Sequence, residues 1–316
     1  MDLSIIIINW NSKDYLRVCL KSVIGGTGDL ACEILVIDNA SHDGAAQMVA
    51  ADFPRVKFIQ SDRNLGFSGG NNHAARQAAG DLLLFLNPDT VVEGDALVKL
   101  VGALRRQPDA GIAGARLLNS DRTLQTSCVQ AFPTVINQLL DCEWLRHRLP
   151  RSPLWGTAAL FENSPEPAPV GAVSGACLMI KRGVFERLGG FEERYFMYSE
   201  DIDLAFRAHQ AGCNCYYVPG AVVIHHGGGS SRNARSKFSN VMTWESVYRF
   251  MRLRRGRFAA GCFRLAIGLS ALLRLPVAMG IWLVRKAAGT EANAPVHKWY
   301  SILRWSFGME SWAARQ

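Results

Sequence analysis

Short apolar runs alternate with helical patterns along the first 90 residues, and this alternation constrains the fold more than any other feature. Residues 3–9 (LSIIIIN) are apolar on both faces, as a strand inside a parallel sheet must be. Runs at 33–38, 56–60 and 82–86 have the same character, and helical spacing follows the first three. Repeated units of this kind predict an α/β fold with a mostly parallel, Rossmann-like sheet flanked by helices.

The regular alternation of expected strands and helices ends after this region. Residues 129–169 hold six prolines and two tryptophans without a clear period, which indicates a long irregular segment at the edge of a ligand-binding site. We expect regular structure again at 170–180, a helix from about 200 to 211, and two strands at 215–218 and 221–225. The sequence therefore predicts an α/β domain over 1–231 and a basic, helical extension over 232–316.

The positive charge belongs to the C-terminal part of the chain. The net charge is +8, but residues 232–286 alone hold twelve Lys and Arg against one acid, Glu245. The remainder is slightly acidic, which removes the main support for a nucleic-acid-binding protein. The eight cysteines form no CxxC and no zinc-finger spacing, so we expect a reducing compartment. The N-terminal run lacks the features of a signal peptide.

Polar motifs follow the expected strands. Asp38 opens DNASHDG directly after the strand at 33–38, where a carboxylate can hydrogen-bond a base or a ribose, although a plain turn explains the same residues. A glycine-rich segment, RNLGFSGGNN, lies at 63–72, and its glycines would let a ligand approach the backbone closely. Ser68 is the expected N-cap of the helix that follows. It is neither GxGxxG nor a Walker motif, and an ordinary glycine-rich loop is the alternative.

Asn87-Pro-Asp89 ends the most hydrophobic strand and puts a carboxylate at the rim of the sheet. Such a carboxylate can bind a divalent cation that also contacts a diphosphate, while an Asn-Pro turn is the alternative. His225 and His226 precede three glycines and suggest a ligand-facing loop that can supply a metal ligand.

Three acids open the helix expected from residue 200: Glu200, Asp201 and Asp203. Capping by Ser199 and the helix dipole can account for acids there. Asp201 and Asp203 point to different faces, so only one of them can face the cleft.

The ordered set of these motifs resembles the inverting glycosyltransferases of family 2, which have the GT-A fold. The resemblance is greatest to the bacterial rhamnosyltransferase-like branch and spans residues 3–231. It rests on IIIINWN (5–11), VIDNASHDG (36–44), RNLGFSGGNN (63–72), LNPDT (86–90), SGACLMIKR (174–182), GGFEERYFMYSEDIDLAFRAHQAG (189–212) and VIHHGGGS (223–230).

The resemblance implies roles for individual residues. Asp201 would be the catalytic base. Asp89 and His225 would hold a divalent metal, Mg²⁺ or Mn²⁺, although Asn87 replaces the first acid of the family's DxD motif. The residues implied in donor binding are Asn9, Asn11, Asp38, Asn39, Asn64, Gly66, Asn71 and Asn87. An inverting transfer needs one general base for the acceptor hydroxyl. It needs no protein acid, because a metal and helix N-termini can neutralise the charge of the diphosphate leaving group.

The implied partners are a nucleotide-diphosphate sugar, either dTDP-rhamnose or a UDP-sugar, and a glycan or lipid-linked acceptor. Nucleic acid is not an expected partner. Two alternatives stay open at this point. A sugar-phosphate nucleotidyltransferase would need a glycine-rich basic signature that IIIINWNSKDYL lacks. A non-catalytic, membrane-associated scaffold of the same fold is disfavoured by the intact Asp89 and Asp201.

The C-terminal extension alternates basic and apolar patches. Arg264 and Arg274 interrupt its longest apolar runs, and Pro276 interrupts the last, so we do not expect a membrane-spanning helix. Apolar stretches flanked by arginine suit helices on an anionic membrane surface, while a helical cap packed on the catalytic domain is the alternative. We expect a cytoplasmic protein, peripheral on the inner face of a bacterial plasma membrane.

Overall fold

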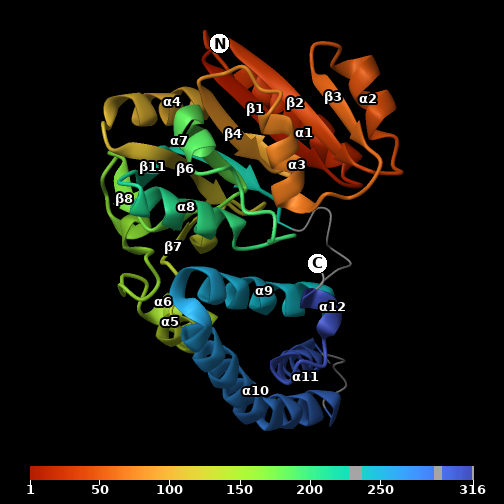
Figure 1. The fold of residues 1–316 in the computed structure, drawn as a ribbon, viewed down its shortest axis with the longest axis vertical. Helices are drawn as coiled ribbons and strands as arrows, with labels where there is room; N and C mark the ends of the chain where they lie inside the picture. Colours follow the sequence, from red (N-terminus) through yellow and green to blue (C-terminus); the bar gives the residue numbers. More distant parts are fainter. Residues whose placement is uncertain (228–236, 288–293, 315–316) are drawn as a thin grey trace. The chain divides into compact units, whose positions relative to one another are not determined.

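A computed structural model describes residues 1–227, 237–287 and 294–314 of the chain. The chain forms two compact units (Figure 1). The first contains Met1–Phe132, Arg146–Phe196 and Glu200–Ser230, and the second contains Pro133–Leu145, Met197–Ser199 and Ser231–Gln316. The C-terminal unit therefore takes in two short segments from within the expected catalytic domain.

A mixed sheet of nine strands forms the centre of the first unit, in the order β3-β2-β1-β4-β10-β6-β11-β5, with β8 paired to β11. The strands are β1 (Leu3–Asn9), β2 (Cys32–Asn39), β3 (Lys57–Ser61), β4 (Leu82–Leu86), β5 (Thr90–Val92), β6 (Ala110–Leu118), β8 (Ala168–Val170), β10 (Cys177–Lys181) and β11 (Asn214–His225). The first four strands in this order are parallel. β10 runs antiparallel to both of its neighbours, β4 and β6.

Helices connect and flank these strands (Figure 1). They are α1 (Lys13–Gly26), α2 (Ala45–Asp52), α3 (Gly66–Ala75), α4 (Ala96–Arg106), α6 (Glu143–Arg148), α7 (Arg182–Arg187) and α8 (Glu200–Gln210), with 3-10 turns η1 (Thr126–Cys128) and η2 (Ala158–Phe161). Two short strands, β7 (Val129–Gln130) and β9 (Ala172–Val173), form a separate antiparallel pair. The expected α/β class is confirmed.

The structure corrects three sequence-based boundaries. The helix expected to begin at Ser68 begins at Gly66, so Ser68 lies inside it and is not its cap. The regular structure expected over 170–180 is present, but it is divided among β8, β9 and β10. The two strands expected at 215–218 and 221–225 are one strand, β11, because a register shift between Val218 and Val222 accommodates Pro219 and Gly220 without ending it.

The core lies on both faces of β1 and β4, as their uniformly apolar sequences require. Alternate side chains of β1, such as Ile5 and Ile7, are fully buried in a core that also includes Leu16 and Leu20 of α1. On β4, Phe85 packs against a different group, with its ring 4.7 Å from the ring of Phe191. Because the parallel strands are covered on both sides, polar side chains are confined to the strand ends.

The second unit is helical. It contains α5 (Val135–Leu140), α9 (Lys237–Phe250), a π-helical turn η3 (Met251–Arg255), α10 (Gly256–Ala287), α11 (Ala294–Ser306) and α12 (Ser311–Ala314). Buried Glu245 on α9 accepts a 2.8 Å hydrogen bond from the indole nitrogen of Trp305 on α11. The guanidinium of Arg264 on α10 lies 5.2 Å from both the Tyr248 and the Trp305 ring. A cation between two aromatic faces thus ties three helices together.

Close packing around Gly114 gives a test of the sheet. A Cβ atom built at this β6 position would overlap the Cβ atom of Val173 on β9, which is fully buried. We expect Gly114→Ala to lower the free energy of unfolding by about 1–3 kcal/mol through overpacking, measured by denaturant melts. Gly183→Ala on α7 is the control, because open space surrounds that position and alanine favours helix. Equal stability of the two variants would contradict the packing described here.

Candidate active site

Three parallel strands bring their polar ends to one edge of the sheet. In the register of β1 and β2, Asn9 lies directly opposite Asp38. In the register of β1 and β4, Ile7 lies opposite Leu86, so Asn87 follows at the same edge. Ligands of open α/β sheets bind at this edge, beyond the carboxyl ends of the strands.

Asp38 is a buried carboxylate held in place by several donors. It accepts hydrogen bonds from the Asn9 amide nitrogen at 2.6 Å, the Ser41 backbone nitrogen at 2.9 Å and the Gln60 amide nitrogen at 2.8 Å. Burial alone would raise the pKa of Asp38, but the hydrogen bonds from Ser41, Asn9 and Gln60 outweigh it and hold the pKa below its usual value. The group is therefore a fixed anion at the strand end.

Asn11 shapes the loop beside this carboxylate. Its backbone has a left-handed φ of 48°, which asparagine tolerates. Its side-chain oxygen accepts a 2.9 Å hydrogen bond from the His42 backbone nitrogen, and its own backbone nitrogen donates to Ser41 Oγ. Asn11 thus joins the loops that follow β1 and β2.

The glycine-rich segment turns sharply at Gly66. Asn64 accepts a 2.9 Å hydrogen bond from the Gly66 nitrogen, and buried Asn39 donates to the Gly66 carbonyl at 3.0 Å. Gly66 has φ +69°, and a Cβ atom there would lie 2.5 Å from the Phe196 carbonyl oxygen. Only glycine fits this position, so the sequence-predicted residues Asn39, Asn64 and Gly66 form one structural unit.

Four buried polar oxygens lie at the ends of β1 and β2 and on α3. Within the described residues, no hydrogen-bond partner contacts Asn9 Oδ1, Asn39 Oδ1, Ser68 Oγ or Asn71 Oδ1. The amide nitrogen of Asn71 instead donates to the Phe67 carbonyl within α3. Buried acceptors that lack donors are costly, so this region suits a polar ligand or ordered water.

A second cluster combines the end of β4 with the end of β11. His225 Nε2 lies 3.4 Å from an Asp89 carboxylate oxygen and 3.3 Å from the Asn87 amide nitrogen. His225 Nδ1 lies 2.8 Å from the carbonyl oxygen of the Gln125 side chain. A carbonyl oxygen only accepts, so Nδ1 donates to Gln125, and Nε2 is the ring nitrogen that faces Asn87 and Asp89.

Asp201 is connected to this cluster through the turn before β10. One of its carboxylate oxygens accepts a 2.8 Å hydrogen bond from the Gly175 backbone nitrogen, and the other accepts from the Ile202 nitrogen. The next residue, Ala176, accepts a 3.0 Å hydrogen bond at its carbonyl from the Asn87 nitrogen. Adjacent residues of one turn therefore hold both Asp201 and Asn87.

The three acids of α8 have different surroundings. Burial raises the pKa of Asp201, although hydrogen bonds from Gly175 and Ile202 oppose the shift. Burial and the neighbouring Asp201 raise the pKa of Glu200 well above its usual value. Asp203 is fully buried and forms an ion pair. Asp201, which is half-buried, is therefore placed to exchange a proton, and its raised pKa makes it a stronger base than an ordinary aspartate.

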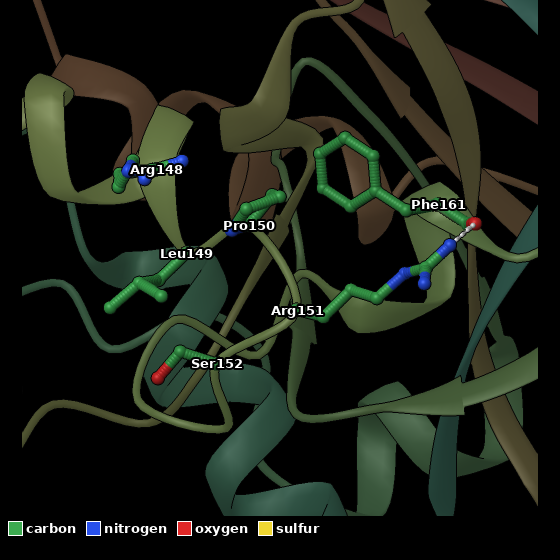
Figure 2. A pocket seen from close by; sticks show the side chains of 6 residues that line it. All are labelled: Arg148, Leu149, Pro150, Arg151, Ser152 and Phe161. Atoms are coloured by element: carbon green, nitrogen blue, oxygen red, sulfur yellow. Dashed lines mark hydrogen bonds between the residues drawn. The ribbon is translucent and has the colours of Figure 1, made fainter.

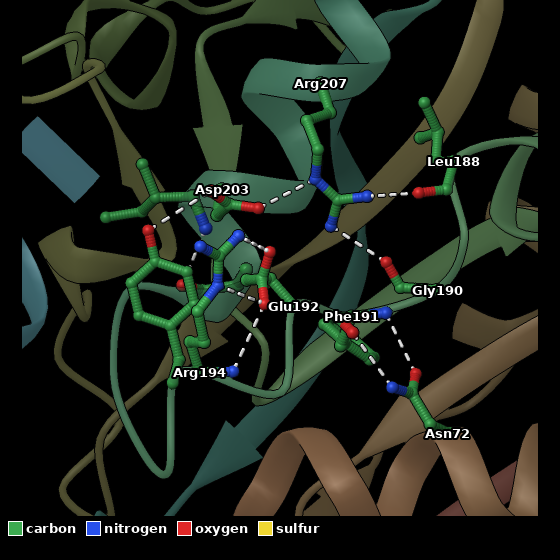
Figure 3. A network of polar contacts seen from close by, with 11 residues as sticks. Asn72, Leu188, Gly190, Phe191, Glu192, Arg194, Asp203 and Arg207 are labelled. Atoms are coloured by element: carbon green, nitrogen blue, oxygen red, sulfur yellow. Dashed lines mark hydrogen bonds and ion pairs between the residues drawn. The ribbon is translucent and has the colours of Figure 1, made fainter. Parts of the chain in front are cut away.

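Asp203 anchors the helix that carries Asp201 (Figure 3). Its carboxylate lies 2.7 Å from Arg207 Nε, one helical turn away, and accepts a 3.1 Å hydrogen bond from the Tyr195 hydroxyl. The same guanidinium donates to the carbonyl oxygens of Leu188 and Gly190. A single arginine thereby fixes α8 to the loop that follows α7.

Asn72 continues this network toward α3. Its amide nitrogen donates to the Phe191 carbonyl at 2.9 Å, and its oxygen accepts from the Phe191 nitrogen at 2.9 Å (Figure 3). This paired arrangement copies the bonding between two β-strands and leaves the Asn72 side chain well satisfied. The network therefore joins α8 to the helix that follows the glycine-rich turn.

A cavity of about 560 Å³ opens elsewhere in the first unit (Figure 2). Its lining residues are Arg148, Leu149, Pro150, Arg151, Ser152 and Phe161. Arg151 crosses the cavity wall to donate to the Phe161 carbonyl at 3.1 Å. None of the residues singled out from the sequence lines this cavity, so it is separate from the strand-end site.

Sequence reasoning missed three residues of the site. Gln60 donates to Asp38, Gln125 orients His225, and Gly175 donates to Asp201. Gly175 lies within the SGACLMIKR motif, and Gln60 lies in the expected strand at 56–60, so their positions in the sequence could have identified both as site residues. Gln125 lies one hundred residues before its partner His225, and no sequence pattern connects the two.

Comparison with known proteins gives a consistent family match. The model of the family described as Glycosyl transferase family 2 matches residues 4–189. An N-acetylglucosaminyl-diphospho-decaprenol L-rhamnosyltransferase of Mycobacterium tuberculosis is 33% identical over 240 residues, which cover 71% of this chain and 76% of that protein. Rhamnosyltransferase WbbL of Escherichia coli K12 is 25% identical over 264 residues, which cover 79% of this chain and 93% of that protein.

A solved structure has the same fold. The mannosyltransferase of Pyrobaculum calidifontis, crystallised with GDP-Man and Mn²⁺, superposes with a TM-score of 0.57 at 17% identity, over 99% of this chain and 85% of that one. At this identity the likeness establishes the fold alone.

The ion pair of fully buried Asp203 with Arg207, whose side chain is 13% exposed, predicts a large effect on stability. Asp203→Asn removes the negative charge and leaves the largely covered Arg207 cation uncompensated, which costs up to about 3–5 kcal/mol. We expect a matching loss in the free energy of unfolding, measured by denaturant melts. Asp95→Asn is the control, because Asp95 pairs with Lys99 on the surface, where such a pair contributes about 1 kcal/mol or less. If the two variants unfold alike, Asp203 does not anchor α8.

Proposed function

Because the chain belongs to glycosyl transferase family 2 and is a glycosyltransferase, we propose an inverting, metal-dependent transfer of a sugar. The donor is a nucleotide-diphosphate sugar, and the acceptor is a hydroxyl group of a cell-surface glycan or a lipid-linked intermediate. The observation that carries the proposal is the turn at Gly175 and Ala176, which holds Asp201 and Asn87 through adjacent backbone groups. It joins a proton acceptor to the end of the strand that precedes Asp89.

The relatives narrow the proposed substrates. Two of them are named rhamnosyltransferases, and one name specifies an acceptor built on a diphospho-decaprenol lipid. We take dTDP-rhamnose as the first donor to test and UDP-sugars as the second. A lipid-linked acceptor would place the enzyme on the inner face of a bacterial plasma membrane, with its catalytic unit in the cytoplasm.

The donor nucleotide would lie along the ends of β1 and β2. Asp38 is a fixed acceptor there and can bind a base or ribose hydrogen. The unpartnered oxygens of Asn39, Ser68 and Asn71 can accept hydrogen bonds from further polar groups of a ligand. Gly66 allows the backbone of α3 to begin close to that ligand, and the helix N-terminus favours negative charge.

In the proposed reaction, Asp201 takes the proton of the acceptor hydroxyl while that oxygen attacks the anomeric carbon. The bond from this carbon to the diphosphate oxygen breaks on the opposite face, so the configuration inverts. The diphosphate leaving group does not need a proton from a protein acid if the charge that develops on it is stabilised electrostatically. Gly175 and Ile202 hold the carboxylate in a fixed orientation for this transfer.

Asp89 and His225 fit a divalent cation. His225 Nε2 faces Asp89, and Gln125 accepts from Nδ1 on the other side of the ring, as second-sphere partners of metal-binding histidines do. The described residues contain no cluster of three or more His, Cys, Asp or Glu side chains suited to a metal. Diphosphate oxygens would complete the ligand set, as is common for Mg²⁺. When bound, the cation would neutralise charge on the leaving diphosphate.

Removing the proposed base gives the most specific test. Asp201→Asn should lower the transfer rate by about 10²–10⁴-fold, the usual contribution of general-base catalysis. Donor affinity, measured by calorimetry, should change little because the base acts in the transition state. Asp95→Asn on the surface serves as the control.

The wild-type pH profile adds an independent readout. The raised pKa of Asp201 predicts that kcat falls as pH decreases, with a midpoint above that of an ordinary aspartate, since only the deprotonated form accepts a proton. Equal loss of donor binding and turnover in Asp201→Asn would instead assign this residue to binding.

The metal proposal predicts a defined role for Gln125. Chelator should abolish transfer, and Mg²⁺ or Mn²⁺ should restore it. In Gln125→Leu, Mn²⁺ affinity in the presence of nucleoside diphosphate should fall by about 10–100-fold, measured from the paramagnetic resonance of free Mn²⁺. Gln125→Glu keeps an oxygen acceptor for His225 Nδ1 and should lose less. Full activity in excess chelator would rule out the metal, and unchanged Mn²⁺ binding in Gln125→Leu would rule out the positioning role.

A further inference from the structure

The outer face of α10 is an unbroken apolar stripe. One side of this helix is buried within the second unit, through Ala260, Phe263, Ile267 and Ala271. Large apolar side chains on the opposite side recur three, four or seven residues apart and are 46–86% exposed. We call them the α10 stripe: Phe258, Leu265, Leu269, Leu272, Met279 and Leu283.

The stripe is too extensive for a surface that faces only water. Leu273, Val277 and Val284 on its flank are also well exposed, by 63–75%. From Phe258 to Leu283 the stripe runs for about 38 Å, at 1.5 Å per helical residue. Soluble proteins rarely expose contiguous apolar patches of this extent without a partner.

The two arginines within this stretch do not interrupt the stripe. Arg264 donates to the carbonyl oxygens of Trp305 at 2.7 Å and Ser306 at 3.2 Å, at the end of α11. Arg274 donates to the Leu139 carbonyl at 3.1 Å, near the end of α5, and lies over the Trp299 ring. Both cations therefore turn inward and satisfy carbonyl groups at helix C-termini, which such cations favour.

The ends of the stripe are cationic. Arg252, Arg254, Arg255 and Arg257 precede it, and Arg285 and Lys286 follow it. Lys286 lies 5.1 Å from the Trp282 ring. An apolar centre with basic and aromatic ends is complementary to a bilayer with anionic headgroups.

Packing distinguishes a helix that lies in the membrane from one that crosses it. By length and composition, Phe238–Ala287 is long and apolar enough to cross, and only 17% of its most apolar window is buried. However, the inner side of α10 packs on α11, which carries His297, Lys298 and Arg304. Hydrocarbon around the whole of α10 would have to enclose the charges of Lys298 and Arg304, which is costly.

We propose that α10 lies in the plane of an anionic membrane surface and inserts its stripe among the acyl chains. The proposal rests on the proposed function, which gives the enzyme a lipid-linked acceptor, and it names the residues that hold the second unit at the membrane. A helix embedded along one face can bind and release the bilayer without a spanning segment.

Vesicle sedimentation of the full chain tests the surface. The wild type should bind phosphatidylglycerol vesicles more than phosphatidylcholine vesicles, and a fraction should stay bound at high salt because apolar insertion is not screened. Leu265→Glu/Leu272→Glu should weaken binding at least about ten-fold, since burying one leucine side chain is worth more than a ten-fold change in affinity. Val18→Glu/Val98→Glu is the matched control, with the same charge change at exposed helical positions of the first unit.

Two further readouts separate the possible failures. Hydrolysis of a soluble donor should be unchanged in Leu265→Glu/Leu272→Glu, so a loss of vesicle binding alone concerns the surface and a loss of hydrolysis concerns the proposed function or folding. Melting curves identify a folding defect. If the wild type ignores anionic vesicles at low salt, or if it forms a dimer that the stripe variant abolishes, the stripe does not bind membranes and the proposal is wrong.

Depth measurements test the orientation. The parent for nitroxide labelling replaces the four accessible cysteines, Cys32, Cys142, Cys213 and Cys262, with serine. Labels at Phe258→Cys, Leu272→Cys and Leu283→Cys in this parent should all report similar, shallow depths. A spanning helix would put the label at 272 at the bilayer centre and the other two near opposite surfaces, which would overturn the in-plane arrangement.

Discussion

The parallel register of β1, β2 and β4 is the constraint on which the site depends. These strands are covered on both faces, so a polar side chain has no place along their length and can occur only where they end. Because the strands are in register, their ends meet: Asn9 lies opposite Asp38, and Asn87 follows β4 at the same edge. An apolar sequence such as that of residues 5–8 (IIII) thereby determines where the hydrogen-bonding groups gather.

The other side of the site is held in place by the ion pair of Asp203 and Arg207, which takes no part in the proposed reaction. Asp203 and Arg207 fix α8 to the loop after α7, and Asn72 ties that loop to α3. Asp201, two residues before Asp203, inherits its position from this framework and is oriented by Gly175. Two acids of one helix thus differ in their surroundings, since Asp203 is fully buried in an ion pair and Asp201 is the one proposed to accept a proton.

The sequence indicated most of the polar residues at the strand ends and few of the residues that hold them in place. Strand ends can be found because apolar runs and the polar residues that stop them are local patterns, so Asp38 and Asp89 could be singled out from them, whereas Asn9 was implied by the family resemblance. The antiparallel entry of β10 between β4 and β6 depends on long-range pairing and was not. Gln125 was missed for the same reason. Arg264 and Arg274 appeared to interrupt an apolar segment, because composition does not show that a neighbouring helix receives them.

The central claim is that a single carboxylate drives direct displacement at the anomeric carbon, and the stereochemistry of the product tests it most directly. The wild-type enzyme would be incubated with a panel of nucleotide-diphosphate sugars and acceptor-bearing membranes, and the anomeric configuration of the transferred sugar determined by NMR. The account predicts a configuration opposite to that of the donor. Retention of the donor configuration would require a second displacement or a different mechanism, and it would contradict the role assigned to Asp201.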